Sequence, residues 1–200
     1  MQDEQPSINL FESPPDETSA EFSSSSKSST KSFLMDALET VAIALIIFFV
    51  IYTFIAQPHL VRGESMQPNY QDGEYILTSK LYHWVGTPER GDVIVLKSPE
   101  DPNVQFIKRV IGLPGEKIKI SNNQVIITNQ EHPKGFALKE KYLGSSTTTN
   151  GSNYIHDNEE VTIPKDKYVV MGDNRDFSYD SRSWGLLDKD KIIGKAFFVY

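Results

Sequence analysis

Residues 105–116 read QFIKRVIGLPGE. The first part of this run is rich in Val, Ile and Phe, which favour β-strands. Successive side chains of a strand point to opposite faces, so Phe106 and Lys108 are expected to share one face while Ile107 points to the other. The Pro-Gly pair at 114–115 then predicts a turn. The stretch is therefore expected to form a strand that ends in a tight turn.

Further runs of this kind predict a β-rich domain over residues 57–200. The runs 117–120 and 124–127 are separated by three polar residues and are expected to form a hairpin. Other expected strands are 74–81, 92–96, 167–171 and 196–200. The stretch 144–153, rich in Ser, Thr and Asn, is expected to be a solvated loop. No helical pattern longer than a turn or two follows residue 56, so the fold class is expected to be mainly β.

An apolar segment precedes this domain. The chain is almost entirely apolar between Ala37 and Ile55, and no charged residue falls between Glu39 and Arg62. About 19 helical residues cross a hydrocarbon core of roughly 30 Å. We therefore expect one transmembrane helix over residues 33–56. Residues 1–32 contain too few apolar side chains to offset their chain entropy, so they are expected to form a disordered tail.

Two other interpretations of the apolar segment stay open at this point, a buried core helix and a cleaved signal peptide. A signal peptide usually has a shorter apolar stretch, a basic start and a small-x-small end. Here an acidic tail precedes the segment and IAQP follows it at 55–58, which favours a retained span. Lys27 and Lys31 before the segment, against Arg62 after it, favour a cytoplasmic N-terminus and an extracytoplasmic β domain.

The composition argues against several classes of function. The formal net charge of -7 is atypical of nucleic-acid-binding proteins, which usually carry a basic patch. The chain has no cysteine, which rules out disulfides, thiolate catalysis and cysteine-ligated zinc. The four histidines lack the His-x-x-x-His spacing of helical zinc hydrolases. No Gly-rich phosphate loop is present either, and we expect neither a metal nor another cofactor.

Four clusters that contain glycine and charged residues stand out, and the last of them also contains several hydroxyl residues. They are GESMQP at 63–68, RGDVIVL at 90–96, IKRVIGLPGE at 107–116 and MGDNRDFSYDSRSWG at 171–185. The first is not a Gly-x-Ser-x-Gly nucleophile elbow, because the second glycine is missing. In this order the clusters resemble the type I bacterial signal peptidases, over about residues 40–200. The resemblance implies a membrane-bound catalytic domain of coiled antiparallel β-sheets that removes signal peptides from exported preproteins.

The resemblance also implies a catalytic dyad of Ser65 and Lys108. A serine hydroxyl is a weak nucleophile at neutral pH and needs an adjacent base. Lysine serves as that base only when neutral, which requires desolvation or a nearby cation to lower its pKa. Lys108 shares its strand face with apolar residues and is expected to be desolvated there. The alternative is an ordinary surface lysine whose charged end reaches solvent.

Residues of the last cluster are expected to support the dyad. Ser178 matches the family serine that holds the lysine amine by a hydrogen bond, and Asp180 and Arg182 match a buried pair that braces the loop. Asp173 and Arg175 are expected to do similar structural work. For Asp180 and Arg182 the alternative is an ordinary surface salt bridge.

The expected oxyanion hole departs from the family pattern. Some members carry a serine two positions before the nucleophile, where this chain has Gly63. The backbone N–H of Ser65 is still available as a donor, but the second donor is not evident from the sequence. Loss of one donor in other enzymes costs on the order of 10²–10³ in rate, so another group is expected to substitute.

The substrate is expected to bind as an extended chain beside the edge strand at 60–63, through main-chain hydrogen bonds. The resemblance implies shallow pockets with a preference for Ala-x-Ala sequences. The candidate lining residues are Val61, Met66, Ile76, Phe106 and Ile107, for which packing in the core is the alternative. The expected partners are therefore exported preproteins and the lipid bilayer.

Two other functions also stay open. A self-cleaving Ser-Lys protease of the repressor type would need a DNA-binding helix-turn-helix and a scissile segment, whereas this chain has an apolar helix. A membrane-anchored β domain that binds partners without catalysis would be expected to lack Ser65 or Lys108, and both are present.

Overall fold

The computed structural model describes residues 26–50, 52, 56–79, 82 and 86–199. Most of the expected tail, residues 1–25, lies outside the described residues, as do residues 51 and 53–55 near the expected end of the membrane segment. The described elements are one long helix and a β domain.

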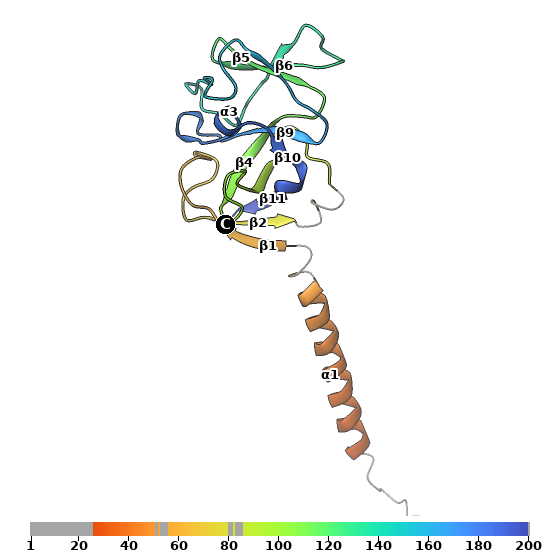
Figure 1. The fold of residues 1–200 in the computed structure, drawn as a ribbon. Coiled ribbons are helices and arrows are strands. Elements are labelled where there is room, and N and C mark those ends of the chain that lie inside the picture. Colours follow the sequence, from red (N-terminus) through yellow and green to blue (C-terminus); the bar gives the residue numbers. More distant parts are fainter. Residues whose placement is uncertain (1–25, 51, 53–55, 80–81, 83–85, 200) are drawn as a thin grey trace, which may run out of the picture. The chain divides into compact units, whose positions relative to one another are not determined.

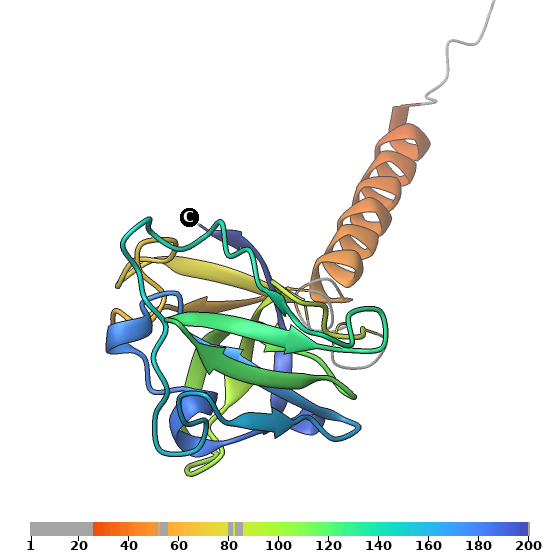
Figure 2. The ribbon, with the colours of Figure 1, turned by 90° about the horizontal axis from the view of Figure 1, so that it is seen from above.

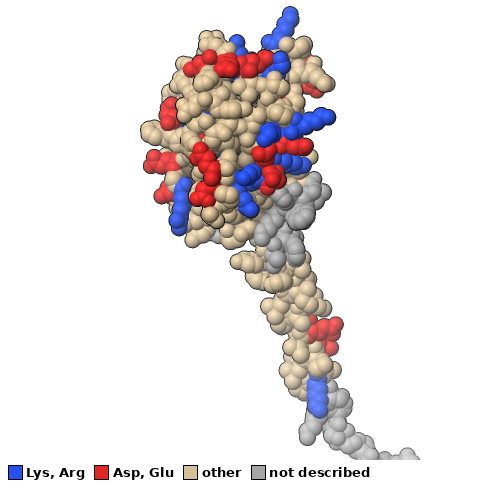
Figure 3. All heavy atoms as spheres, viewed as in Figure 1, with Lys and Arg blue, Asp and Glu red and all other residues tan. Residues whose placement is uncertain are grey.

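The helix α1 (Ser26–Val50) contains the apolar segment. It begins at Ser26, so residues 26–32, which we expected to belong to the tail, are helical. The physical reason is that extending an existing helix costs much less than nucleating one. Its portion Thr30–Val50 has 21 residues, enough to cross a core of about 30 Å, and none of that portion's apolar window is buried. Residues 40–50 contain no charged residue, and Figure 3 shows charged side chains at only a few places along the helix.

The β domain consists of two antiparallel sheets (Figures 1 and 2). The larger has the order β1-β2-β11-β3-β4-β9-β10 and the smaller the order β7-β6-β5-β8. The strands of the larger sheet are β1 (Ala56–Leu60), β2 (Tyr75–Ser79), β3 (Val93–Lys97), β4 (Gln105–Gly112), β9 (Lys167–Met171), β10 (Leu187–Asp188) and β11 (Ile192–Val199). Those of the smaller are β5 (Lys117–Ser121), β6 (Gln124–Thr128), β7 (Phe136–Ala137) and β8 (Glu160–Thr162). The mainly β prediction is therefore confirmed.

The helices of the β domain whose bounds the structure describes are short. They are η2 (Arg175–Phe177), α3 (Ser181–Trp184) and η3 (Lys189–Lys191). Two of the three, η2 and α3, lie in the last of the four sequence clusters, between β9 and β10. That cluster is therefore a compact connection with helical turns rather than an open loop.

The stretch 105–116 joins the two sheets, because β4 belongs to the larger sheet and β5 to the smaller. The carboxylate of Glu116 accepts a hydrogen bond of 2.9 Å from the Leu113 amide and pairs with Nη2 of Arg90 at 2.5 Å. Those contacts fix the turn that the Pro-Gly pair predicted. β5 and β6 then form the expected hairpin, with Ile118 opposite Ile127.

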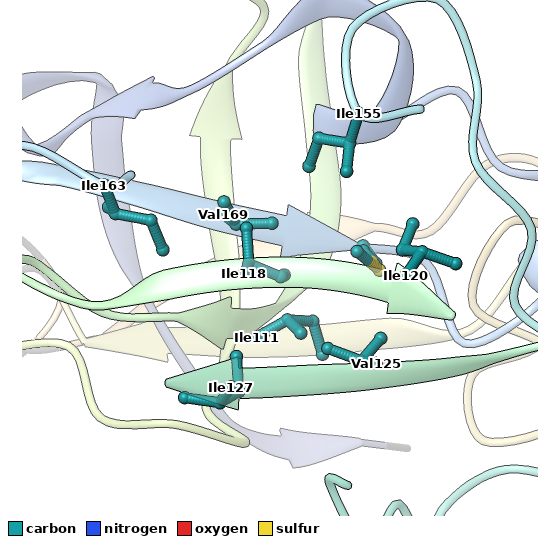
Figure 4. Close-up of a cluster of buried hydrophobic side chains, with 9 residues drawn as sticks. Ile111, Ile118, Ile120, Val125, Ile127, Ile155, Ile163 and Val169 are labelled. Carbon is teal, nitrogen blue, oxygen red and sulfur yellow. The ribbon is translucent and has the colours of Figure 1, made fainter. Parts of the chain in front are cut away.

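Three clusters of buried side chains form the core. One lies between the sheets (Figure 4) and consists of Ile111, Ile118, Ile120, Val125, Ile127, Ile155, Ile163, Val169 and Met171. The other two lie on opposite faces of β3 and β4. Ile107 belongs to one of them together with Val93 and Val95. Phe106 packs against the other, which contains Ile94 and Leu96. The predicted alternation along β4 is thus confirmed.

The sequence patterns located the long strands better than the short ones. β7, β8 and β10 have only two or three residues and were not expected. β11 begins at Ile192, four residues before the expected strand. β1 contains Pro58, which is tolerated because the strand lies at the sheet edge. The prediction of a wholly solvated loop at 144–153 is wrong, since Thr149 is buried and its hydroxyl accepts a hydrogen bond from Arg175.

Candidate active site

Ser65 and Lys108 are in direct contact. Lys108 lies on β4, and Ser65 lies in the turn at 63–70 that follows β1. The Nζ atom of Lys108 donates a hydrogen bond of 2.7 Å to Oγ of Ser65 and another of 3.0 Å to the carbonyl oxygen of Ile107. The two residues that the sequence suggested as a dyad are therefore within proton-transfer distance.

Lys108 is desolvated rather than exposed. The residue is 3% exposed, and Nζ lies 5.4 Å from the centroid of the Phe106 ring. Burial lowers the pKa of Lys108 to about 8, although the carboxylates of Asp180 and Asp173 act in the opposite direction. The positive charge of Arg182 adds to the lowering. A base with a pKa near 8 has a useful neutral fraction close to neutral pH.

The backbone on either side of the Ser65 hydroxyl is held by Asn174. Its amide N–H donates a hydrogen bond of 3.0 Å to the carbonyl oxygen of Ser65. Its side-chain Nδ2 donates another of 3.1 Å to the carbonyl oxygen of Glu64. We did not predict this role for Asn174 from the sequence, although its place in the densest cluster was a signal. The last cluster therefore positions the serine as well as surrounding the lysine.

The main-chain amides near Ser65 differ in their availability. The N–H of Gly63 donates a hydrogen bond of 2.7 Å to Oδ1 of Asp72, so it is already engaged. Gly63 also has φ of 87°, a left-handed conformation that favours glycine. The N–H of Ser65 donates no hydrogen bond to any described residue, so it remains open to an incoming oxyanion.

The expected hydrogen bond between Ser178 and the Lys108 amine is not formed. The Ser178 hydroxyl oxygen is buried and has no hydrogen-bond partner among the described residues, because the amine is turned toward Ser65 and the Ile107 carbonyl. Even so, the hydroxyl lies in the site. A Cβ atom on Gly172 would collide with both Oγ of Ser178 and the carbonyl oxygen of Ser65. Gly172 therefore leaves the space in which the two serines come together.

Asp180 and Arg182 form a buried ion pair, not a surface salt bridge. The Asp180 carboxylate accepts hydrogen bonds of 2.9 Å from both Nε and Nη2 of Arg182, and the side chains are 0% and 7% exposed. Asp180 also accepts a bond of 3.0 Å from the Gly172 amide, and Arg182 donates one of 2.6 Å to the carbonyl oxygen of Arg175. The pair therefore ties together the two ends of the connection between β9 and α3.

A cavity of about 430 Å³ opens beside the dyad. Its lining consists of Pro58, His59, Leu60, Val61, Arg62, Ser65, Ile76, Val95, Asn103, Gln105, Phe106, Ile107 and Lys108. Four of the five candidate substrate-binding residues, Val61, Ile76, Phe106 and Ile107, belong to this lining. Met66 does not, because its side chain is 1% exposed and packs in the core cluster that contains Ile107.

The strands β1 and β4 supply part of this lining, and each has an edge without a described strand neighbour. β1 is a terminal strand of its sheet and pairs only with β2 in the described structure. β4 pairs with β3 along 105–109, but with β9 only from Arg109 onward, so one edge of residues 105–108 is free of strand pairing. Such edges can bind an extended peptide through main-chain hydrogen bonds.

The comparisons with known proteins agree with this arrangement. The family model described as "Signal peptidase, peptidase S26" matches residues 34–200. The chain belongs to this signal peptidase family. Signal peptidase IB of Staphylococcus aureus (strain N315) is 34% identical over 181 residues, covering 85% of this chain and 91% of that protein. Signal peptidase I P of Bacillus subtilis subsp. natto is 34% identical over 171 residues, covering 85% and 90%.

A solved structure is also similar to the signal peptidase described here. The crystal structure of a signal peptidase I from Enterococcus faecalis V583 is 31% identical, covers 55% of this chain and 96% of its own, and gives a TM-score of 0.44. Membership of family S26 makes the chain a serine peptidase that cleaves signal peptides, and a Ser-Lys dyad is general to that family. With its apolar helix, the signal peptidase is a membrane-anchored enzyme. Because the chain belongs to the signal peptidase family, the two alternative functions, a repressor-type protease and a non-catalytic binding domain, are not supported.

Proposed function

We propose that Ser65 is the nucleophile of this signal peptidase and Lys108 its general base. The observation that carries the proposal is the 2.7 Å hydrogen bond between Nζ of Lys108 and Oγ of Ser65 in a desolvated setting. Neutral Lys108 takes the hydroxyl proton as Ser65 Oγ attacks the scissile carbonyl carbon. The Lys108 ammonium then gives that proton to the leaving nitrogen, which becomes the amino terminus of the mature protein.

The second half of the reaction uses the same two residues. The carbonyl carbon of the signal peptide is then esterified to Ser65, and neutral Lys108 takes a proton from a water molecule that attacks this ester. Collapse of the tetrahedral intermediate returns that proton to Oγ of Ser65 and releases the signal peptide as a carboxylic acid, which loses its proton to solvent. In both halves the Ser65 N–H donates to the oxyanion, because it is adjacent to the reacting oxygen and donates to no other described residue.

The substrate is proposed to lie in the cavity between the free edges of β1 and β4. Val61, Ile76, Phe106 and Ile107 supply apolar walls close to Ser65. The preference for small residues at the cleavage site is proposed from membership of the signal peptidase family. Met66 does not line the cavity, but it packs in the same core cluster as Val61, Ile76 and Ile107 and so supports these lining residues.

Ser178, Asp180 and Arg182 are proposed to support catalysis. The Asp180–Arg182 pair fixes the connection that brings Ser178 to the site. The buried hydroxyl of Ser178 is proposed to bind the Lys108 amine after that amine has taken the serine proton. This is supported by its position beside Gly172 and by its lack of another partner among the described residues.

The membrane arrangement is proposed to be single-pass. Residues 33–56 would cross the cytoplasmic membrane, the tail at 1–32 would be cytoplasmic, and the β domain at 57–200 would lie on the outer face. The support is the length of the apolar helix and the basic residues Lys27 and Lys31 before it. Protease added outside intact spheroplasts should digest the β domain and spare an N-terminal tag; protection of the β domain would contradict this orientation.

The function is tested by cleavage of a preprotein with the purified full-length protein in detergent. Ser65→Ala and Lys108→Ala should each lower the rate by at least about 10³, since each removes a reacting group. The matched controls are Ser145→Ala and Lys97→Ala, which alter exposed side chains outside the cavity and should cleave at the normal rate. Substantial activity of either dyad variant would overturn the assignment.

A further inference from the structure

Residues 140–142 contact sequence neighbours of Ser65, Lys108 and Ser178, although they lie outside the four sequence clusters. Asn69 lies four positions after Ser65, Arg109 directly follows Lys108, and Arg175 lies three positions before Ser178. Side-chain or main-chain groups of residues 140–142 bind each of these three residues. The contacts therefore link the separate segments from which the site is assembled.

Tyr142 makes two of the links. Its carbonyl oxygen accepts a hydrogen bond of 2.8 Å from Nδ2 of Asn69. Its ring lies under the guanidinium of Arg109, with Cζ 4.0 Å from the ring centroid. A cation over an aromatic face is attracted by the ring quadrupole, so the ring fixes the arginine that follows Lys108 on β4. One residue thus contacts both the turn of the serine and the strand of the lysine.

Asp173 contacts the same two segments. Its carboxylate accepts hydrogen bonds of 2.7 Å and 2.5 Å from Nε and Nη2 of Arg109, and one of 2.9 Å from Nδ2 of Asn69. The Asp173 side chain is 0% exposed, and a bidentate pair of this kind has a defined geometry. Nδ2 of Asn69 therefore donates to two groups, one on Asp173 and one on Tyr142.

Glu140 makes the third link. Its carboxylate accepts two hydrogen bonds from the Arg175 guanidinium, one of them 3.0 Å long, and a further bond of 2.6 Å from the Tyr142 hydroxyl. Nε of Arg175 donates 3.0 Å to the carbonyl oxygen of Gly172, so the arginine is tied to the site as well. The Arg175 side chain is 0% exposed, and loss of its partner would leave a buried charge unpaired.

We propose that residues 140–142 are a positioning clamp. The clamp holds three segments in one arrangement: the turn that contains Ser65, the strand β4 that carries Lys108, and the connection after β9 that contains Ser178. The proposal rests on the proposed roles of Ser65 and Lys108. Proton transfer needs the reacting atoms held within a fraction of an ångström, and small misplacements in enzymes cost up to about 10²-fold in rate. Asn69, Glu140 and Tyr142 are positioning residues, because none of them is among the residues that line the cavity.

The sharpest variant is Asn69→Ala, because Asn69 is exposed and its loss leaves no cavity in the core. Misplacement of the Ser65 turn should lower kcat about tenfold. KM should change by less than about twofold, since the clamp does not line the peptide-binding cavity. The matched control is Gln71→Ala, whose side-chain amide donates only to Pro68 within the same turn, and which should keep kcat and KM.

Two substitutions of Tyr142 distinguish the contribution of its ring to kcat from that of its hydroxyl. Tyr142→Phe keeps the ring under Arg109 and the carbonyl bonded to Asn69, so kcat should stay within about twofold of normal. Tyr142→Leu removes the ring and should lower kcat about tenfold. Because the contacts act as a unit, the Asn69→Ala/Tyr142→Leu double variant should lose less than the product of the two single losses.

The assay uses the full-length protein in detergent at a temperature where unfolding curves show every variant to be folded, with Ser65→Ala included. A normal kcat for Asn69→Ala, with Ser65→Ala inactive, would overturn the clamp and leave the dyad intact. Equal kcat values for Tyr142→Phe and Tyr142→Leu would also overturn it. Activity of Ser65→Ala would instead overturn the proposed function on which the clamp depends.

Discussion

Oγ of Ser65 and Nζ of Lys108 lie 2.7 Å apart although 43 positions separate the two residues in the chain. β4 carries Lys108 into the domain between two core clusters, where its amine loses most of its hydration. The turn of Ser65 reaches the same point because Asn174 binds the backbone on both sides of the hydroxyl. The contact therefore brings the Ser65 hydroxyl next to an amine whose burial lowers its pKa.

Replacement of Lys108 by methionine is expected to stabilise the β domain at pH 7. Burial lowers the pKa of Lys108 from 10.5 to about 8, so the protonated amine is less favourable in the folded protein than in the unfolded chain. At about 1.4 kcal/mol per pKa unit, this difference corresponds to about 3 kcal/mol, which methionine would remove. The measurement is the free energy of unfolding by urea in detergent.

The difference in the free energy of unfolding between the Lys108→Met variant and the wild type should shrink as the pH rises from about 8 to 10.5. Over that interval the folded wild type has released the Lys108 proton while the unfolded chain still binds it, so the wild type gains stability. Lys97→Met, at an exposed lysine on β3, should change the free energy of unfolding by less than about 0.5 kcal/mol. A Lys108→Met variant no more stable than the wild type at pH 7 would count against a desolvated lysine.

Gly172→Ala is expected to abolish most activity. The added methyl would overlap Oγ of Ser178 and the carbonyl oxygen of Ser65, and the carbonyl can move only with its turn. Overpacking of this kind typically costs about 1–3 kcal/mol, and the displaced serine should lower kcat about 10²-fold. Gly144→Ala is the control, because its methyl would meet only the Thr147 hydroxyl, at 3.3 Å. Normal cleavage by Gly172→Ala would show that the turn of Ser65 tolerates displacement.

Ser178→Ala should affect activity and stability differently. The Ser178 hydroxyl is buried without a partner among the described residues, so its removal should leave the free energy of unfolding unchanged or slightly higher. If the hydroxyl binds the Lys108 amine during the reaction, kcat should nevertheless fall about tenfold or more. A variant with full activity would remove Ser178 from the catalytic site.

The parts of the fold that sequence predicts best are those with a regular pattern. The alternation along 105–111 placed Ile107 and Phe106 on opposite faces of β4, as found. The hairpin of β5 and β6 has two such runs around a short polar turn. β7, β8 and β10 have two or three residues each, too few for a pattern, and form only because longer strands offer them an edge.

The partners of the charged residues in the site were not predictable in the same way. Asp173 and Arg175 stand two positions apart, yet each pairs with a residue distant in the chain, Arg109 and Glu140 respectively. Glu140 lies outside all four sequence clusters, and only tertiary structure brings it to Arg175. The sequence pointed to Ser65 and Lys108 through motifs that resemble a known family, whereas many residue types can supply a supporting contact.

The pH dependence of kcat/KM tests the role of Lys108 most directly. Only the neutral amine can accept the Ser65 proton, so the rate should rise with pH through the lowered pKa of Lys108, about 8. A single group of that pKa predicts a rise of about tenfold between pH 7 and pH 9, with a plateau above. The assay is cleavage of one preprotein at low concentration by the full-length protein, with folding checked at each pH. A rise centred near pH 8 is the predicted result, and a rate independent of pH from about 6 to 9 would contradict a lysine base.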